Sequence, residues 1–230
     1  MKITRWIALF VLIVAAHAMA RAQFKPYTFG FKVAPAIGWV HTDTKGYDGG
    51  SSMSFSWGFA SEFNFTENHC IATGINFQFN NGTITYPDLR NIDGTDELVS
   101  VNRKLRVKYL QIPLTLKMRT EEKNNMSFFG QFGLGTGFRF RADGKDEYSS
   151  PSGATVTESN NIDGDVAFMR ESLIVGLGME YRISSGNMVS VGLTLDNGFT
   201  DILSGSNKAD PSLEPKGTSS LVELSLGILF

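Results

Sequence analysis

Hydrophobic and polar residues alternate with a period of two over most of the chain. Between Met53 and Phe65, large apolar side chains occupy nearly every second position, and small or polar residues separate them. After a polar break at residues 66–68, the same alternation continues to Phe79. A period of two is that of a strand with two unlike faces, and two such runs joined by a short polar segment predict a β-hairpin.

The whole sequence follows this pattern after its first 22 residues. It predicts eight strands, at residues 28–41, 51–65, 69–80, 104–118, 126–141, 165–183, 188–200 and 218–230. The connections alternate in length, and the long ones read as exposed loops at residues 42–50, 81–103, 142–164 and 201–217. Helical periodicity is absent from these segments. The fold class predicted is all-β, an eight-stranded antiparallel up-and-down barrel.

The fourth predicted strand contains two irregularities. Its apolar residues from Leu110 to Met118 share one face, whereas Leu105, Val107 and Tyr109 fall on the opposite phase. We therefore expect a bulge or phase switch near Tyr109. Pro113 lies inside this strand, where it removes one backbone donor from the ladder.

The first residues form a separate unit. Lys2 and Arg5 precede an apolar run from Trp6 to Ala16, and small residues follow. This arrangement predicts a secretory signal peptide at residues 1–22, with residues 23–230 as the barrel domain; cleavage fits after Ala20 or Ala22, and Ala22 is preferred. The alternative is an N-terminal membrane anchor, for which the apolar run is short.

Alternation alone leaves open which face of the barrel meets water. A soluble barrel that carries a ligand has its apolar residues inside, and a membrane barrel has them outside, against lipid. The second face of these strands is mostly Gly, Ala, Ser and Thr, which suits a narrow interior. Long loops at one end and short turns at the other also match membrane barrels. We therefore predict a transmembrane barrel whose last strand pairs with its first, because lipid tolerates no free sheet edge.

The predicted interior face carries a balanced set of charges. The cations are Lys32, Lys117, Arg139 and Arg182, and the anions are Glu62, Glu180, Asp196 and Glu223. Charges enclosed in a narrow lumen must pair, because unpaired burial is costly. We expect Lys32 to lie between Glu62 and Glu223. The alternative is a scatter of solvent-exposed charges.

Aromatic residues gather near both ends of the predicted strands. Those near the long loops are Trp39, Trp57, Phe77, Phe79, Phe138, Phe140 and Phe199, and those near the short turns are Phe29, Phe63, Phe65, Phe128, Tyr181 and Phe230. Two aromatic girdles that flank an aliphatic band are typical of a barrel that spans a membrane.

Composition and candidate chemistry exclude several classes of function. A net charge of −2 argues against a nucleic-acid binder with a basic surface. The single cysteine, Cys70, allows no internal disulfide. His41, with Asp43 or Ser51 and Ser52 nearby, offers part of a hydrolase site, but a polar residue at the membrane interface is the simpler interpretation.

Two loop segments carry oxygen ligands of the kind that calcium prefers. They are Asn91–Glu97 and Asn160–Asp165, and neither has the EF-hand spacing. Since Asn, Asp and Gly are also ordinary turn residues, we expect no metal, no cofactor and no enzymatic activity.

Several motifs resemble one family. They are Tyr109–Lys117 (YLQIPLTLK), the Phe-Gly-x-Lys-x-x-Pro that begins at Phe29, Gly133-x-Gly135-x-Gly137, Gly176–Tyr181 and Gly227–Phe230. Together they resemble the PorT-like outer-membrane β-barrel proteins of Bacteroidota. The resemblance implies signal-directed export, insertion by the outer-membrane assembly machinery, and a single small barrel in which a proline at position 113 is normal. The terminal Phe230 resembles the signal that this machinery recognises.

The sequence therefore favours a non-enzymatic outer-membrane barrel with a lumen filled by side chains. It would contact outer-membrane lipid and lipopolysaccharide, and it would act through its extracellular loops or as part of an envelope complex. PorT itself is associated with type IX secretion, so a role related to secretion is a further expectation. The alternatives are a lipid-modifying barrel enzyme and a soluble carrier similar to lipocalins.

Overall fold

The computed structural model describes residues 25–150, 153–184, 186–205 and 207–230. The predicted signal peptide, residues 1–22, lies outside the described residues. Within the described ranges, no helix is long and apolar enough to cross a membrane.

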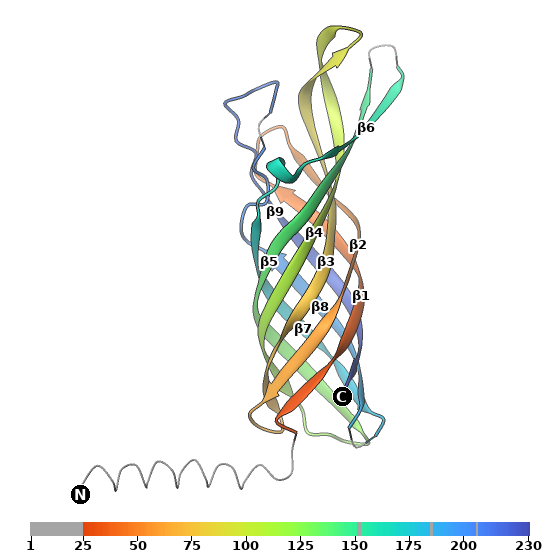
Figure 1. The fold of residues 1–230 in the computed structure, drawn as a ribbon, viewed down its shortest axis with the longest axis vertical. Helices are drawn as coiled ribbons and strands as arrows, with labels where there is room; N and C mark the ends of the chain where they lie inside the picture. The colour runs from red at the N-terminus through yellow and green to blue at the C-terminus, as the bar shows by residue number, and fades with distance from the viewer. Residues whose placement is uncertain (1–24, 151–152, 185, 206) are drawn as a thin grey trace, which may run out of the picture.

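The described chain is a closed β-barrel (Figure 1). Its strands are β1 (Tyr27–Thr42), β2 (Asp48–Asn64), β3 (His69–Ile92), β4 (Thr95–Arg119), β5 (Met126–Ser149), β6 (Thr155–Asn161), β7 (Met169–Arg182), β8 (Met188–Gly198) and β9 (Gly217–Leu229), with a 3₁₀ turn, η1, at Asp163–Asp165. Eight strands form the antiparallel ring, and β6 pairs only with the far part of β5. The predicted eight-stranded up-and-down barrel is confirmed.

The ring closes between the first and last strands. β1 and β9 pair antiparallel from Gly30 and Leu229 to Thr42 and Gly217. Beyond the ladder, the backbone N–H of Phe230 donates to the carbonyl oxygen of Phe29 at 2.7 Å. The seam is therefore paired from end to end except at Ala34 and Pro35, so the barrel has no free edge.

The apolar face of the barrel points outward. Phe55 is 41% exposed and Phe132 is 50% exposed, whereas Glu62 and Lys117 are almost completely buried. The exposed large apolar side chains form a belt around all eight strands of the ring. The predicted orientation is confirmed, because a soluble barrel would show the reverse pattern.

One aromatic side chain, Phe129, lies on the inner face and helps to fill the lumen. Its ring packs against the ammonium group of Lys117, 4.2 Å from the ring centroid. A Cβ atom at Gly178 would come within 2.6 Å of this ring, and one at Gly192 within 3.1 Å. Glycine at these two positions therefore leaves the space that Phe129 occupies.

The predicted exposed loop at residues 81–103 is wrong. β3 and β4 continue as a paired hairpin to Ile92 and Thr95, and Asp93 and Gly94 make the two-residue turn with φ of 51° and 88°. Two positive φ values match a type I′ turn, for which Asp-Gly is a preferred sequence. The predicted loop at 142–164 is also partly strand, because β5 runs to Ser149 and β6 pairs with it, while β7 begins only at Met169.

One side of the barrel is therefore taller than the other. The far ends of β3, β4 and β5, together with β6, rise well beyond the ends of the remaining strands (Figure 1). We call this part, residues 81–105 and 141–161, the extension.

Of the two alternatives expected near Tyr109, the structure has the bulge, and its extra residue lies in the partner strand β5. Lys108 pairs with Arg141 and Tyr109 with Arg139, so Phe140 is the extra residue in β5. β4 itself keeps one phase, since Val107 and Tyr109 are buried on the same inner face as Gln111. What changes along β4 is which face carries the apolar side chains. From Leu110 to Met118 they lie on the outer face, and from Val99 to Tyr109 they lie on the inner face.

The upper barrel and the extension share a hydrophobic core. Its buried members come from seven segments of the chain, and they are Val40, Tyr47, Ile84, Tyr86, Val99, Val101, Leu105, Val107, Tyr109, Ala142, Tyr148, Ile162, Val166 and Ile202. An apolar interior beneath a polar exterior is the pattern of a water-soluble structure. The extension is thus folded like a small soluble domain that continues from the barrel strands.

Pro113 lies where the ladder between β3 and β4 is interrupted. Pairing stops at Thr73–Leu114 and resumes at Asn76–Gln111. No residue of β3 is paired with Pro113, so the missing backbone N–H of proline costs no hydrogen bond in this ladder.

Candidate functional site

The lumen is crossed near its short-turn end by four charged residues from β2, β4 and β7, of which three are buried and Arg119 is partly buried. The ammonium group of Lys117 donates to Glu62 at 2.6 Å and also to Glu180. The guanidinium group of Arg119 donates to Glu180 from Nε at 2.6 Å and to Glu62 through Nη2. Two cations and two carboxylates thus form a neutral cluster, the lower charge layer, in which each charge touches two opposite ones.

A pocket opens at the short-turn end and ends at this layer. Its volume is about 590 Å³, and Arg119 and Glu180 are part of its lining. At its rim, Nε of Arg182 donates to Glu122 at 2.7 Å, with both side chains more than a third exposed. The prediction that Arg182 belongs to the lumen charges is therefore wrong, because it pairs with the β4–β5 turn.

A second layer of buried polar groups crosses the middle of the barrel. Arg170 is fully buried and donates from Nη2 to Asp196 at 2.7 Å. The other oxygen of Asp196 accepts from the side-chain amides of Gln78 at 3.0 Å and Gln111 at 2.5 Å. Arg170 also bonds to Ser219 of β9. This upper charge layer joins β3, β4, β7, β8 and β9.

Lys32 and Glu223 lie between the two layers. Nζ of Lys32 is 4.0 Å from Oε2 of Glu223, whose other oxygen accepts from Ser56 at 2.8 Å. The expected position of Lys32 between Glu223 and Glu62 is half right, since Lys117 and Arg119 hold Glu62 instead. A cavity of about 100 Å³ remains between the layers.

These layers predict that the barrel does not conduct ions freely. Reconstituted in planar bilayers, the full chain should show no large steady conductance, because paired side chains of the two layers cross the narrow lumen. The checking measurement is single-channel recording under an applied voltage. A stable open level that persists after repeated reconstitution would contradict the closed lumen.

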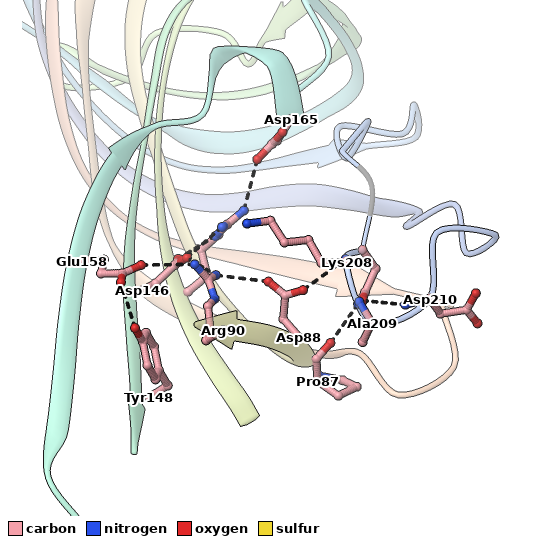
Figure 2. A network of polar contacts seen from close by, with 12 residues as sticks. Pro87, Asp88, Arg90, Asp146, Tyr148, Glu158, Asp165, Lys208, Ala209 and Asp210 are labelled. Carbon is pink, nitrogen blue, oxygen red and sulfur yellow. Dashed lines mark hydrogen bonds and ion pairs between the residues drawn. The ribbon is translucent and has the colours of Figure 1, made fainter. Parts of the chain in front are cut away.

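A third charged cluster lies in the extension (Figure 2). Asp146 is buried and accepts from Arg103 at 2.6 and 2.8 Å, and from Arg90 at 2.7 Å. Arg90 also lies 3.3 Å from Asp88 and 3.2 Å from Glu158. Burial alone would raise the pKa of Asp146, but hydrogen bonds and positive charge from Arg103 and Arg90 hold it below its ordinary value.

The last long loop docks on this cluster. The side-chain amide of Asn207 donates to the hydroxyl of Tyr47 and to the carbonyl oxygen of Pro87, both at 2.8 Å. The backbone N–H of Lys208 donates to Asp88 at 3.1 Å (Figure 2). The loop between β8 and β9 is thereby fixed to β3, so the extension braces the mouth of the barrel.

Several residues of the charge layers were not predicted, although their odd or even position along the strand places them on the inner face. Arg119 continues the inner face of Lys117, but the predicted strand ended at residue 118. Arg170 has the same parity as Glu180, and Gln111 the same parity as Lys117. Arg139, which was predicted for the lumen, lies opposite the inward-facing Tyr109, and its Nη1 contacts Asp163 of η1 at 2.6 Å.

The predicted girdle residues make ring contacts at both ends of the belt. Near the long loops, Trp57 stacks on Phe77 with centroids 4.5 Å apart, and Phe140 meets Phe77 edge-on at 6.4 Å. Near the short turns, Phe63 contacts Tyr27 at 5.4 Å. The remaining girdle residues point outward and are exposed or half-buried: Trp39, Phe79, Phe138, Phe65, Phe128, Tyr181 and Phe230.

The candidate catalytic and calcium-binding residues have other roles. His41 lies 3.2 Å from Asp43, and both side chains are largely exposed. Asp163 accepts from the backbone N–H of Ala142 at 2.6 Å and from Arg139, so protein donors already hold its carboxylate. Across the described ranges, no three His, Cys, Asp or Glu side chains are grouped to hold a metal ion.

Comparisons with known proteins agree with this architecture. The family model described as "Outer membrane protein beta-barrel domain" matches residues 22–204. Neisserial surface protein A has a crystal structure similar to this chain, with a TM-score of 0.50 at 12% identity, covering 89% of this chain and 96% of that one. OprG from Pseudomonas aeruginosa is similar at a TM-score of 0.46 and 10% identity, over 90% and 97% of the two chains. The comparison with curated proteins gave no match.

Proposed function

The chain belongs to the outer membrane protein beta-barrel domain family, which indicates the outer membrane as its location, and from this premise we propose that it is a non-enzymatic recognition protein. The barrel anchors it and seals its own lumen. The extension presents a preformed surface outside the cell to a macromolecular partner, as a component of an envelope complex.

The extension is the observation that carries this proposal. Its buried core and its Arg90–Asp146–Arg103 cluster hold four strands in a fixed arrangement. A surface that is ordered before binding loses little conformational entropy when a partner docks. At the extension, Leu98 is 65% exposed, which suits a contact with protein.

The absence of catalysis is part of the proposal. The His41–Asp43 pair is open to solvent and lies in no cleft of the kind that excludes water during acid–base chemistry. The buried carboxylates of the lumen are each held by cations, so none is left as a free general base. A lipid-modifying enzyme is therefore the weaker candidate.

The resemblance to PorT-like proteins of Bacteroidota supports a role beside other envelope proteins. We propose that residues 1–22 direct export and are cleaved, and that the assembly machinery inserts the barrel by recognising its last strand and Phe230. A link to type IX secretion is the most specific form of this proposal, and it rests on the resemblance alone.

Site-specific photocrosslinking tests the proposal. A photoreactive residue at Leu98 should give a discrete adduct in native envelopes, and one at Glu121, in the β4–β5 turn at the opposite end, serves as the control. Replacing residues 84–103 with an Asp-Gly turn between Thr83 and Lys104, which pair in the hairpin, should abolish co-purification of the crosslinked partner with this chain. Adducts only from Glu121 would overturn an extracellular partner and favour a periplasmic one.

A further inference from the structure

One face of the barrel carries a concentration of positive charge at the upper rim of the apolar belt. The outward positions of β4 and β5 above this rim hold five cations and two anions: Lys104, Arg106, Lys108, Arg141 and Lys145, with Asp143 and Glu147. We call these residues the basic rim. The two strands pair directly there, with Lys108 opposite Arg141 and Arg106 opposite Asp143.

The height of the basic rim along the barrel is sharply defined. Phe79 of β3 pairs with Lys108, and Phe140 immediately precedes Arg141. The ammonium group of Lys108 lies 5.9 Å from the centroid of the Phe79 ring. The outer face thus changes from aromatic to cationic within one residue, at the level where hydrocarbon gives way to lipid headgroups.

Two of these cations are available to a ligand. Lys104 and Lys145 both reach Glu147, at 3.1 and 2.9 Å, and Arg141 reaches Asp143 at 2.8 Å. Neither Arg106 nor Lys108 has an ion pair among the residues that the structure describes. The rim therefore keeps a net positive charge after its internal pairs are formed.

Other strands carry acidic or neutral outward groups near the same rim. Glu171 of β7 accepts from Thr136 at 2.9 Å, and exposed Asp201 follows β8. β1 presents His41 and β2 presents Ser51. Exposed lysines elsewhere at this end, Lys45, Lys208 and Lys216, lie singly in loops, so a cluster of cations on paired strands belongs to the β4–β5 face.

We propose that the basic rim binds the phosphate groups of a phosphorylated glycolipid of the outer leaflet, with Arg106 and Lys108 as the principal contacts. This rests on the proposed outer-membrane anchoring, but not on the proposed recognition role of the extension. Acyl chains would pack on Phe79 and Phe140, and the phosphate would meet the guanidinium and ammonium groups directly above. Arg141 would exchange its partner Asp143 for the lipid phosphate.

Native mass spectrometry of the full chain in detergent tests the proposal. Titration with lipid A should give a discrete adduct, while lipid A stripped of its phosphates, phosphatidylcholine and inorganic phosphate should not. The combined substitutions Arg106→Gln, Lys108→Gln and Arg141→Gln should weaken lipid A binding on the order of a hundredfold, because each cation near a membrane surface contributes about a fivefold step.

The matched control removes three exposed lysines elsewhere on the same end, with Lys45→Gln, Lys208→Gln and Lys216→Gln, and should leave the adduct unchanged. Heat-dependent gel mobility verifies that each variant is a folded barrel, and Arg106→Gln alone serves if the triple variant is not. Equal binding of dephosphorylated lipid A, an adduct with inorganic phosphate alone, or equal loss in the control would each overturn the proposal. These outcomes bear only on lipid binding by the basic rim, and crosslinking at Leu98 tests the partner of the extension separately.

Discussion

Replacing Arg170 with methionine is expected to lower the free energy of unfolding by about 3–5 kcal/mol, because it leaves Asp196 buried without its cation. Asp196 would keep only the two amide donors of Gln78 and Gln111. The measurement is denaturant unfolding of the full chain in phosphatidylcholine vesicles, followed by tryptophan fluorescence.

Two further variants test whether the loss of stability comes from leaving Asp196 buried without a cation or merely from removing an arginine side chain. Arg182→Met removes the half-exposed pair with Glu122 and should cost no more than about 1 kcal/mol. Arg170→Met combined with Asp196→Asn should recover much of the stability, since a buried pair contributes little beyond neutralising its own members. A loss for Arg170→Met as small as that for Arg182→Met would show that the upper charge layer does not hold the strands together.

The second large effect is expected in the extension, from Asp146→Asn. The substitution places the guanidinium groups of Arg90 and Arg103 beside each other without the carboxylate that both contact. Local opening should become easier by about 3 kcal/mol, which corresponds to roughly a hundredfold faster amide exchange in the far parts of β3, β4 and β5. Hydrogen exchange of these strands, compared with β7 and β8, is the measurement.

The control lies on the outward side of the same strand. Asp143→Asn removes an exposed pair with Arg141 and should leave exchange in the extension unchanged. Acid should imitate Asp146→Asn in the native chain. Because the pKa of Asp146 is lowered on folding, its stabilisation is complete above the ordinary aspartate pKa, about 3.9, and is lost only as the pH falls below that value. Protection lost between pH 7 and pH 5 would contradict the assigned network.

The barrel was predictable from the chain because a period of two continues through every strand that lipid contacts. Met53, Phe55 and Trp57 face outward as expected, and the small residues between them are buried. The extension was not recognised, because its apolar residues change faces at the end of the belt. Phe79 faces outward, whereas Ile84 faces inward. If lipid is assumed to surround the whole strand, this change of face breaks the alternation, and the segment is taken for an irregular loop.

The charge layers were predictable in kind but not in membership. Phase assigned Glu62, Lys117 and Glu180 to one face, but the partner of each depends on strand stagger around the ring, which sequence alone does not give. Arg119 was not assigned because the predicted strand ended at residue 118. Arg170 was not assigned because the apolar residues of its strand define the opposite face. The Asp93-Gly94 turn carried a readable hairpin signal, and it was outweighed by the many charged residues around it.

The continuity of β3 and β4 also fixes how far the hairpin tip stands above the apolar belt. The twelve residues from Asn81 to Ile92 span about 40 Å along the strand, or about 30 Å along the barrel axis at a usual strand tilt. A headgroup layer is only about 5–8 Å thick on each side of a bilayer. The hairpin tip therefore clears the lipid surface by a wide margin, so a bulky molecule such as an antibody can reach it without entering the headgroup layer.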